Sequence, residues 1–157
     1  TLGLEIDEQL KGLGQSADTI LVAVGGGGLI SGVSSWFGDT SRVVGVEPER
    51  SCALNAALEA GAPVDVDVSG IAADSLGARR IGELNFAILR QNGVTAIKVS
   101  DDDIRAAQKR LWRTHRIVAE PGGATSLAAL ISGRYRPEPE SRVCAIVCGG
   151  NTDAVKF

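Results

Sequence analysis

Four consecutive glycines, Gly25–Gly28, are the residues of this sequence whose spacing most clearly suggests chemistry. Glycine loses more backbone freedom on folding than any other residue, so a run of four needs a compensating purpose. A backbone without side chains lets several N–H groups close around an anion, and a helix that begins at the end of the run adds the positive end of its dipole. The run therefore predicts a phosphate site, with a tight turn that binds no ligand as the alternative.

Two common phosphate-binding motifs do not fit this run. A dinucleotide fingerprint needs glycines at positions i, i+2 and i+5, and counting from Gly25 or Gly26 puts isoleucine or serine at the last position. A nucleoside-triphosphate loop needs a lysine followed by serine or threonine, and no lysine lies between Lys11 and Lys98. The phosphate is therefore not expected to belong to a dinucleotide or a nucleoside triphosphate.

The other reactive side chains are few and scattered. Cys52, Cys144 and Cys148 cannot all pair, and the histidines or further cysteines of a zinc site are missing. Reduced thiols and a cytoplasmic location are the expectation. His115, the only histidine, is predicted to lie on the surface at the end of a helix, and the acidic run Ser100–Asp103 is interpreted as a helix start.

Composition limits the partners of the chain. Its 157 residues, 44% of them hydrophobic, suffice for one domain with a core. The net charge is −3, basic residues are not clustered and only six residues are aromatic, which argues against nucleic acid and a charged membrane surface. No apolar run approaches the ~20 residues of a membrane span, and the first residues follow a polar helix pattern, not that of a signal peptide. A small molecule is the expected partner.

Strand and helix patterns alternate along the chain. The apolar run Ile20–Val24 predicts a strand buried on both faces, and the spacing from Gly28 to about Phe37 predicts a helix. Further strands are expected at Arg42–Pro48, Val94–Val99 and Val143–Val147 (the last also buried), and further helices at 4–13, 51–61 (capped by Ser51), 74–90, 100–111 and 121–133.

This alternation predicts an α/β fold, a mainly parallel sheet with helices on both faces. In such sheets ligands collect at the carboxyl ends of the strands. The glycine run follows the strand that ends at Val24, and a second cluster, Gly149 and Gly150, follows the strand that ends at Val147. Both clusters are therefore expected at the same edge.

Five segments give this pattern a more specific meaning. They are AVGGGGLISG, VVGVEPE, SGIAADSLG, IVAEPGGATSLAAL and VCGGN. In this order they resemble motifs in the later half of the serine and threonine dehydratases, which are fold type II pyridoxal-phosphate enzymes. The resemblance covers Thr1 to Asn151, and an ordered set of five is more specific than any one motif. It implies a tryptophan-synthase-β-like large domain, pyridoxal 5'-phosphate as cofactor, an amino-acid substrate and a homodimer.

The resemblance assigns roles to the two glycine clusters. It implies that the amides of Gly25–Gly28 and Leu29 bind the cofactor phosphate, and that the Cys148 side chain lies beside the pyridine nitrogen, as in the serine dehydratase variant. A neutral thiol is a weak donor and acceptor and does not hold the ring protonated as an aspartate does. The ring is then a milder electron sink, which is adequate for β-elimination of a hydroxyl. The alternative for Cys148 is a small buried cysteine at the end of a core strand.

Two further residues enter the cofactor pocket through the resemblance. Glu120 precedes a helix that the family packs near the cofactor; its alternative is a carboxylate that favours the helix dipole. Gly70 matches the pocket-lining glycine of an aspartate-glycine motif, although Ser69 replaces the aspartate.

A cation site is the last implication. Glu47 matches a carboxylate that helps to coordinate a structural cation, together with a backbone carbonyl, here that of Ser51, and an oxygen ligand at the position of Ala53. Alanine offers no oxygen, so only a weaker ion held through waters is expected at Glu47. A strand-end carboxylate that faces solvent is the alternative.

The resemblance also implies catalytic and substrate-binding residues that this sequence does not contain. The family's Schiff-base lysine precedes the glycine loop by well over a hundred residues, and its serine-glycine-asparagine loop binds the substrate carboxylate. None of the lysines stands in a matching motif; these are Lys11, Lys98, Lys109 and Lys156. Residues 1–157 are thus expected to be an incomplete larger domain without the catalytic lysine. Three alternatives stay open, namely a non-catalytic fragment that binds phosphate ligands or a partner chain, a serine racemase and a threonine synthase.

Overall fold

The computed structural model describes residues 1–153, which contain one parallel sheet in the order β3-β2-β1-β4. The strands are β1 (Thr19–Ala23), β2 (Arg42–Pro48), β3 (Thr95–Val99) and β4 (Val143–Ala145). The helices are α1 (Leu2–Gly12), α2 (Gly28–Phe37), α3 (Ala53–Ala60), α4 (Ala73–Leu76), α5 (Glu83–Gln91), α6 (Asp101–His115) and α7 (Pro121–Ile131). No helix in this part of the chain is long and apolar enough to cross a membrane.

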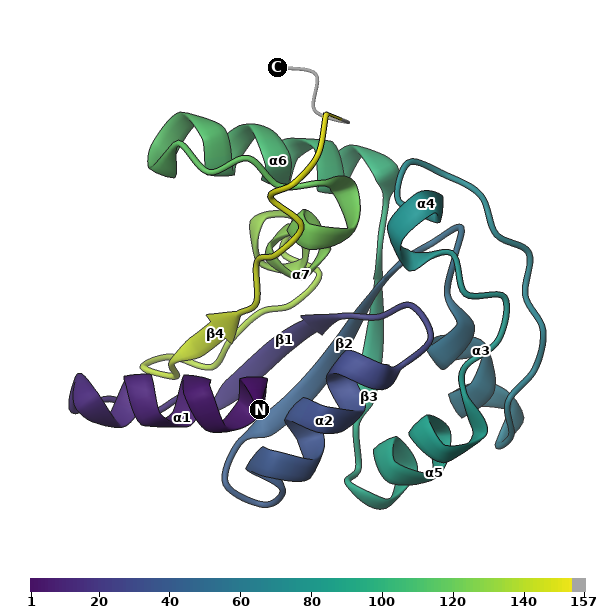
Figure 1. Cartoon of the computed structure of the whole chain (residues 1–157), viewed down its shortest axis with the longest axis horizontal. Coiled ribbons are helices and arrows are strands. Elements are labelled where there is room, and N and C mark those ends of the chain that lie inside the picture. The colour runs from purple at the N-terminus through teal and green to yellow at the C-terminus, as the bar shows by residue number, and fades with distance from the viewer. Residues whose placement is uncertain (154–157) are drawn as a thin grey trace.

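Alternate residues of β1 build two separate cores. Ile20 and Val22 face one core together with α2, α3 and α5, whereas Leu21 faces the other together with α6 and α7. Figure 1 shows α6 and α7 on one side of the sheet and α2 and α5 on the other. The predicted α/β fold with helices on both faces is therefore confirmed, and β1 is buried along its whole length as its apolar letters indicate.

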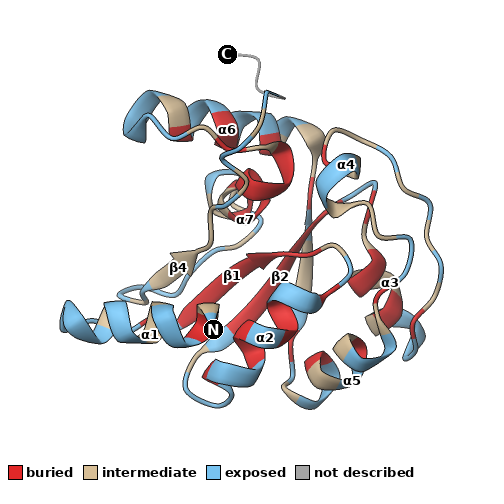
Figure 2. Cartoon of the chain, in the orientation of Figure 1, coloured by how far each residue is buried: buried red, intermediate tan, exposed pale blue. Residues whose placement is uncertain are grey.

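The last strand differs from its prediction. β4 ends at Ala145 instead of Val147, and all three of its residues are only half-buried. Figure 2 shows β4 in the intermediate colour beside the buried β1. The physical reason is position, because β4 lies at an end of the strand order and pairs with β1 alone, through three residues. A short edge strand is covered on fewer sides than a central one.

The helix predicted for 74–90 is two helices. α4 ends at Leu76, and α5 begins at Glu83. Between them the backbone bonds to other segments: the Arg79 carbonyl accepts from the Val66 N–H at 2.8 Å, and the Gly82 N–H donates to the Gly26 carbonyl at 3.2 Å. These contacts replace helical hydrogen bonds and bring the start of α5 onto the glycine run.

Helix termini follow the sequence signals at most positions. Ser100 and Asp103 form the predicted capping box of α6, with bonds of 3.2 and 3.0 Å. Pro121 occupies the first turn of α7, and His115 is exposed at the end of α6 as expected. Ser51, however, does not cap α3, because its hydroxyl donates instead to the Leu76 carbonyl at 2.8 Å.

Candidate functional site

The glycine loop Gly25–Gly28 leaves the carboxyl end of β1 and leads directly into α2. The Val24 N–H still donates to the Val46 carbonyl of β2, so the loop starts where the sheet ends. Gly27 is the N-cap residue of α2, no side chain caps this helix, and its first turn holds no acidic residue. The first N–H groups of α2 are therefore left without a side-chain acceptor, which is the arrangement that binds anions.

One position of the loop requires glycine and a second leaves little room for a side chain. Gly27 has a φ of +90°, and a Cβ there would lie 2.5 Å from Ile81 Cδ1. A Cβ on Gly25 would lie 3.3 Å from Leu76 Cα. At Gly28, by contrast, a Cβ would meet nothing within 4 Å. The loop is thus packed tightly on its protein side and open at the start of the helix, where a ligand has room.

The segment around α4 joins the glycine loop to α7. Leu76 contacts Gly25 with its backbone, and its Cγ lies 3.0 Å from where a Cβ of Gly122 would be. Ser75 lies so close to Gly122 that a Cβ there would overlap the serine hydroxyl. Ser75 and Leu76 therefore support the candidate site by packing, Leu76 between the glycine loop and α7 and Ser75 against α7. Both residues belong to the motif SGIAADSLG, in which the sequence alone singles out only Gly70.

Gly70 itself lies elsewhere in the same segment. Its φ is +88°, and a Cβ there would meet the Asp101 carboxylate at 2.8 Å and Arg50 Cβ at 3.4 Å. The structure therefore places Gly70 at the start of α6 rather than against the glycine loop. Its role in lining the cofactor pocket stays a prediction.

Cys148 lies at the same edge of the sheet as the glycine loop. β4 runs parallel to β1, and the Ile146 N–H continues the pairing by donating to the Leu21 carbonyl at 3.1 Å. Cys148 follows two residues later, just as the loop follows β1. Close packing on α7 fixes its position, because a Cβ on Gly123 would overlap the Cys148 carbonyl. This placement agrees with the expectation that both glycine clusters lie at one edge of the sheet.

Glu120 connects α7 to the segment after β4. It is the N-cap residue of α7, but its carboxylate makes no capping hydrogen bond. Its N–H donates to the Gly149 carbonyl at 2.8 Å, and its Cγ lies 2.5 Å from where a Cβ of Gly149 would be. The carboxyl group thus lies next to Cys148 and also at the positive end of α7, so both its pocket role and its alternative, a favourable interaction with the helix dipole, stay predictions.

The Cys148 side chain is exposed on one side. Partial burial of the thiol, assisted by the negative charge of Glu120, raises its pKa above the ordinary value. A raised pKa keeps this side chain a neutral thiol near pH 7, which is the protonation state that the sequence argument assumed. Its exposure contradicts the alternative of a buried cysteine at the end of a core strand.

Glu47 serves the fold in a way that the sequence did not indicate. Its carboxylate accepts hydrogen bonds from the N–H groups of Leu54 and Asn55 and from Asn55 Nδ2, at 2.7 to 2.8 Å. Glu47 is fully buried, so the alternative of a solvent-facing carboxylate was wrong. Burial raises its pKa, and the three hydrogen bonds oppose that rise. Among residues 1–153 no group of three or more acidic, histidine or cysteine side chains is arranged to hold a metal.

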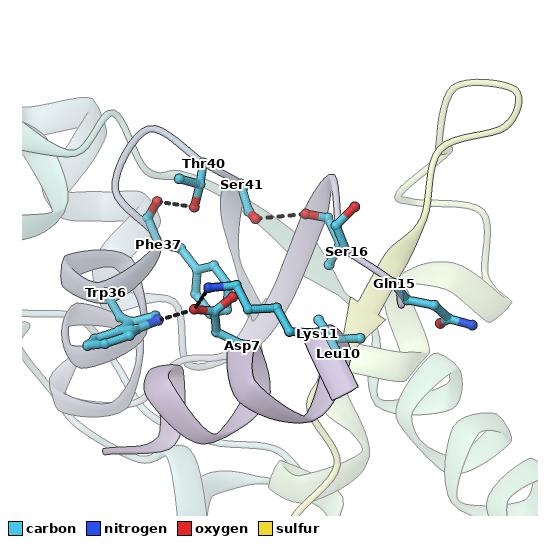
Figure 3. Close-up of a pocket in the computed structure, with 10 residues that line it drawn as sticks. Asp7, Leu10, Lys11, Gln15, Ser16, Trp36, Phe37, Thr40 and Ser41 are labelled. Carbon is cyan, nitrogen blue, oxygen red and sulfur yellow. Dashed lines mark hydrogen bonds and ion pairs between the residues drawn. The ribbon is translucent and has the colours of Figure 1, made fainter. Parts of the chain in front are cut away.

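The lysines lie apart from this edge or face solvent. Lys11 Nζ donates a hydrogen bond to the Asp7 carboxylate at 2.8 Å. Both residues, with Trp36, line a cavity of about 320 Å³ (Figure 3). This cavity lies where α1 and the end of α2 meet the start of β1, at the opposite end of the sheet from the glycine loop. Lys98 and Lys109 are exposed. Lys156 lies outside the described residues.

The residues at the carboxyl edge fit pyridoxal 5'-phosphate. Uncapped amides at the start of α2 match a phosphate dianion, and open space adjoins Gly28. A neutral thiol at Cys148 matches an unprotonated ring nitrogen. One arrangement thus offers an anion site and a weakly polar site within the same edge of the sheet.

Comparisons with known proteins point in the same direction. A family model described as "Pyridoxal-phosphate dependent enzyme" matches residues 1–149. Phenylserine dehydratase of Ralstonia pickettii is 38% identical over 160 residues, which cover 100% of this chain and 48% of that protein.

Two solved structures share the fold. A threonine deaminase from T.th. has a TM-score of 0.86 and 32% identity, over 96% of this chain and 56% of that one. Maize serine racemase has a TM-score of 0.85 and 32% identity, over 96% of this chain and 46% of that one. The chain therefore spans about half the length of these relatives.

Proposed function

Because this chain belongs to the family of pyridoxal-phosphate dependent enzymes, we propose that it forms the phosphate- and ring-binding part of an ammonia-lyase. In the whole enzyme, L-threonine or L-serine loses its α-proton and its β-hydroxyl, and hydrolysis then yields a 2-oxo acid and ammonia. The bound cofactor draws electrons away from the substrate α-carbon. The observation that carries this proposal is the placement of the glycine loop and Cys148 at one edge of the sheet.

Each candidate residue has a distinct task in this proposal. The amides of Gly25–Gly28 and Leu29 bind the phosphate, and the Cys148 thiol lies beside the ring nitrogen without protonating it. Glu120 adds a negative charge near that thiol, which together with burial raises the thiol pKa and favours its neutral form. Glu47 supports α3, and we propose no divalent ion there. A homodimer and a cytoplasmic location stay predictions. The three free cysteines agree with the cytoplasmic location.

The cofactor-binding lysine belongs to the remainder of a longer polypeptide in this proposal. Two observations support it. The chain spans about half of its relatives, and Lys11 is held by Asp7 at the far end of the sheet.

Borohydride reduction tests this division of labour. The isolated chain is mixed with pyridoxal 5'-phosphate, reduced and digested, and its lysine adducts are identified by mass spectrometry. We expect no stoichiometric adduct. A full adduct on Lys11 or Lys98 would show that the chain carries its own reactive lysine and would overturn this part of the proposal.

Product analysis of the longer polypeptide tests the reaction itself. It is supplied with the cofactor and with L-threonine or L-serine, and release of 2-oxo acid and ammonia is measured. Stoichiometric formation of both products is expected. The likeness to maize serine racemase favours a second candidate, racemisation, for which chiral chromatography would detect D-serine in excess of 2-oxo acid. Binding of the cofactor with neither product would instead favour the non-catalytic fragment.

A further inference from the structure

A second helix holds the glycine loop from its protein side. The Gly26 carbonyl accepts two hydrogen bonds from the start of α5, one from Asn85 Nδ2 at 2.8 Å and one from the Gly82 N–H at 3.2 Å. Asn85 is half-buried, and its Cβ lies 3.0 Å from where a Cβ of Gly27 would be. Asn85 therefore touches the loop directly, at Gly26 and Gly27, whereas the position beside Gly28 is open.

These hydrogen bonds orient the Gly26 carbonyl and, with it, the N–H of Gly27 in the same peptide unit. Every described peptide bond is trans, so the carbonyl of one residue and the N–H of the next point in opposite directions. Because the Gly26 carbonyl points at α5, the Gly27 N–H points away from α5. A loop of glycines has many backbone conformations of similar energy, and an outside contact is needed to select one.

The next peptide is fixed from α2 itself. The Gly27 carbonyl accepts hydrogen bonds from the Ser31 N–H at 3.0 Å and from the Ser31 hydroxyl at 2.7 Å. The Gly28 N–H consequently points out of the helix start. The Ser31 hydroxyl also lies 3.4 Å from the Asn85 carbonyl, so one buried serine and one asparagine connect the loop, α2 and α5.

We propose that Asn85 is a positioning residue for phosphate binding. It touches no ligand, and it turns the Gly26–Gly27 peptide so that the Gly27 and Gly28 N–H groups converge on the phosphate group. This inference rests on the proposed function, because it presupposes that the glycine loop binds the cofactor phosphate. Backbone donors that are already oriented lose less entropy when the anion arrives, so removal of the asparagine amide weakens phosphate binding.

A matched control separates positioning from simple attachment of two helices. Asn92, at the other end of α5, donates from Nδ2 to the Ser34 hydroxyl of α2 at 3.2 Å. The Asn92→Ala change thus also removes a hydrogen bond donated by an asparagine amide of α5, here to α2 itself instead of to the glycine loop. It does so far along α2 from the glycine loop, and Asn92 has no part in the candidate site.

The test compares two ligands that differ only in the phosphate group. Dissociation constants of pyridoxal 5'-phosphate and of pyridoxal are measured for the whole protein and its variants by equilibrium dialysis. For Asn85→Ala we expect affinity for the phosphorylated ligand to fall about tenfold and affinity for pyridoxal to stay within about twofold. Asn92→Ala is expected to leave both within about twofold, even where both variants lose similar thermal stability.

Each failure has its own signature. If Asn85→Ala keeps the wild-type preference for the phosphorylated ligand, or loses affinity for both ligands equally, Asn85 is only structural and the inference is wrong. If the wild-type protein shows no preference for the phosphorylated ligand, the proposed phosphate role of the loop fails. Should Asn85→Ala not fold, Asn85→Ser is used, since its shorter side chain cannot reach Gly26 and the same loss of preference is expected.

Discussion

At the scale of single residues, the proposed site depends on the protonation state of the Cys148 thiol. Its pKa is raised by partial burial and by the Glu120 carboxylate. A hydrogen-bond partner that stays neutral does not compete for a proton with a ring nitrogen, whereas a thiolate would attract one. Burial and the nearby carboxylate thus act in the same direction, with burial the larger cause, and both favour the neutral thiol.

Alkylation of Cys148 tests how much the Glu120 charge contributes to the raised pKa of the thiol. Only the thiolate reacts with iodoacetamide, so the rate should rise at a pH above the ordinary cysteine pKa of about 8.5. Peptide mass spectrometry distinguishes Cys148 from the other cysteines. Glu120→Gln removes the negative charge and should move the rise to lower pH. A rise at lower pH in the wild type than in Glu120→Gln would contradict the assigned cause.

At the scale of elements, Glu47 joins β2 to the start of α3 through three accepted hydrogen bonds. In Glu47→Gln an amide NH₂ replaces one acceptor oxygen and faces donor groups. We expect urea unfolding at pH 7 to show a loss of about 1–3 kcal/mol. Glu49→Gln, which breaks an ion pair of half-exposed side chains with Arg134, should change stability by less than about 1 kcal/mol.

The same variant reveals the sign of the Glu47 pKa shift. A carboxyl whose pKa is raised in the folded state binds its proton at higher pH than in the unfolded chain. Its stabilising protonation is complete below the unfolded value of about 4.3 and is lost as pH rises through the raised folded value. As the pH falls from 7 to 4.5, the wild type should therefore gain stability relative to Glu47→Gln. A relative decrease would show that the hydrogen bonds outweigh burial.

The capping box of α6 offers a second test at this scale. Ser100→Ala removes the hydroxyl that accepts from the Asp103 N–H, and about 1 kcal/mol of unfolding free energy should be lost. Ser35→Ala, at an exposed position within α2, is the control and should be neutral or slightly stabilising. Equal effects of the two changes in chemical denaturation would mean that the box does not stabilise α6.

At the scale of the whole molecule, the two edge strands differ. β3 pairs with β2 through five residues, whereas β4 pairs with β1 through three and is half-buried. Local opening of β4 breaks fewer contacts, so amide hydrogen exchange of this chain should be at least about tenfold faster in β4 than in β1, with β3 between them. Equal protection of β3 and β4 would contradict this order.

Sequence periodicity predicted the fold where local signals were strong. Arg42–Pro48 and Gly28–Phe37 match β2 and α2 at both ends, because a short apolar run, helical spacing and glycine boundaries are properties of the chain itself. The break at 77–82 was missed, since it depends on the distant Gly26 carbonyl. The half-burial of β4 was missed for a similar reason, because an apolar sequence does not indicate whether a strand has neighbours on both sides or lies at the edge of the sheet.

The candidate site shows the same division. The glycine run and the VCGGN motif were visible as letters, and parallel strands placed them at one edge. Ser75, Leu76 and Asn85 were not selected, because they act through packing and through one carbonyl that only the folded chain brings near. The burial of Glu47 was equally hidden, since a glutamate at a strand end gives no sign of the helix that covers it.

The glycine loop has a consequence for how binding responds to its surroundings. Gly25–Leu29 contains no side chain that gains or loses a proton, so the cradle keeps the same charge across the whole biological pH range. In the proposed phosphate site, a change of affinity with acidity then comes from the ligand, whose second ionisation lies near pH 6, or from titratable groups outside the loop. A backbone cradle of this kind discriminates by the charge state of what enters it and leaves acid and base sensing to residues elsewhere.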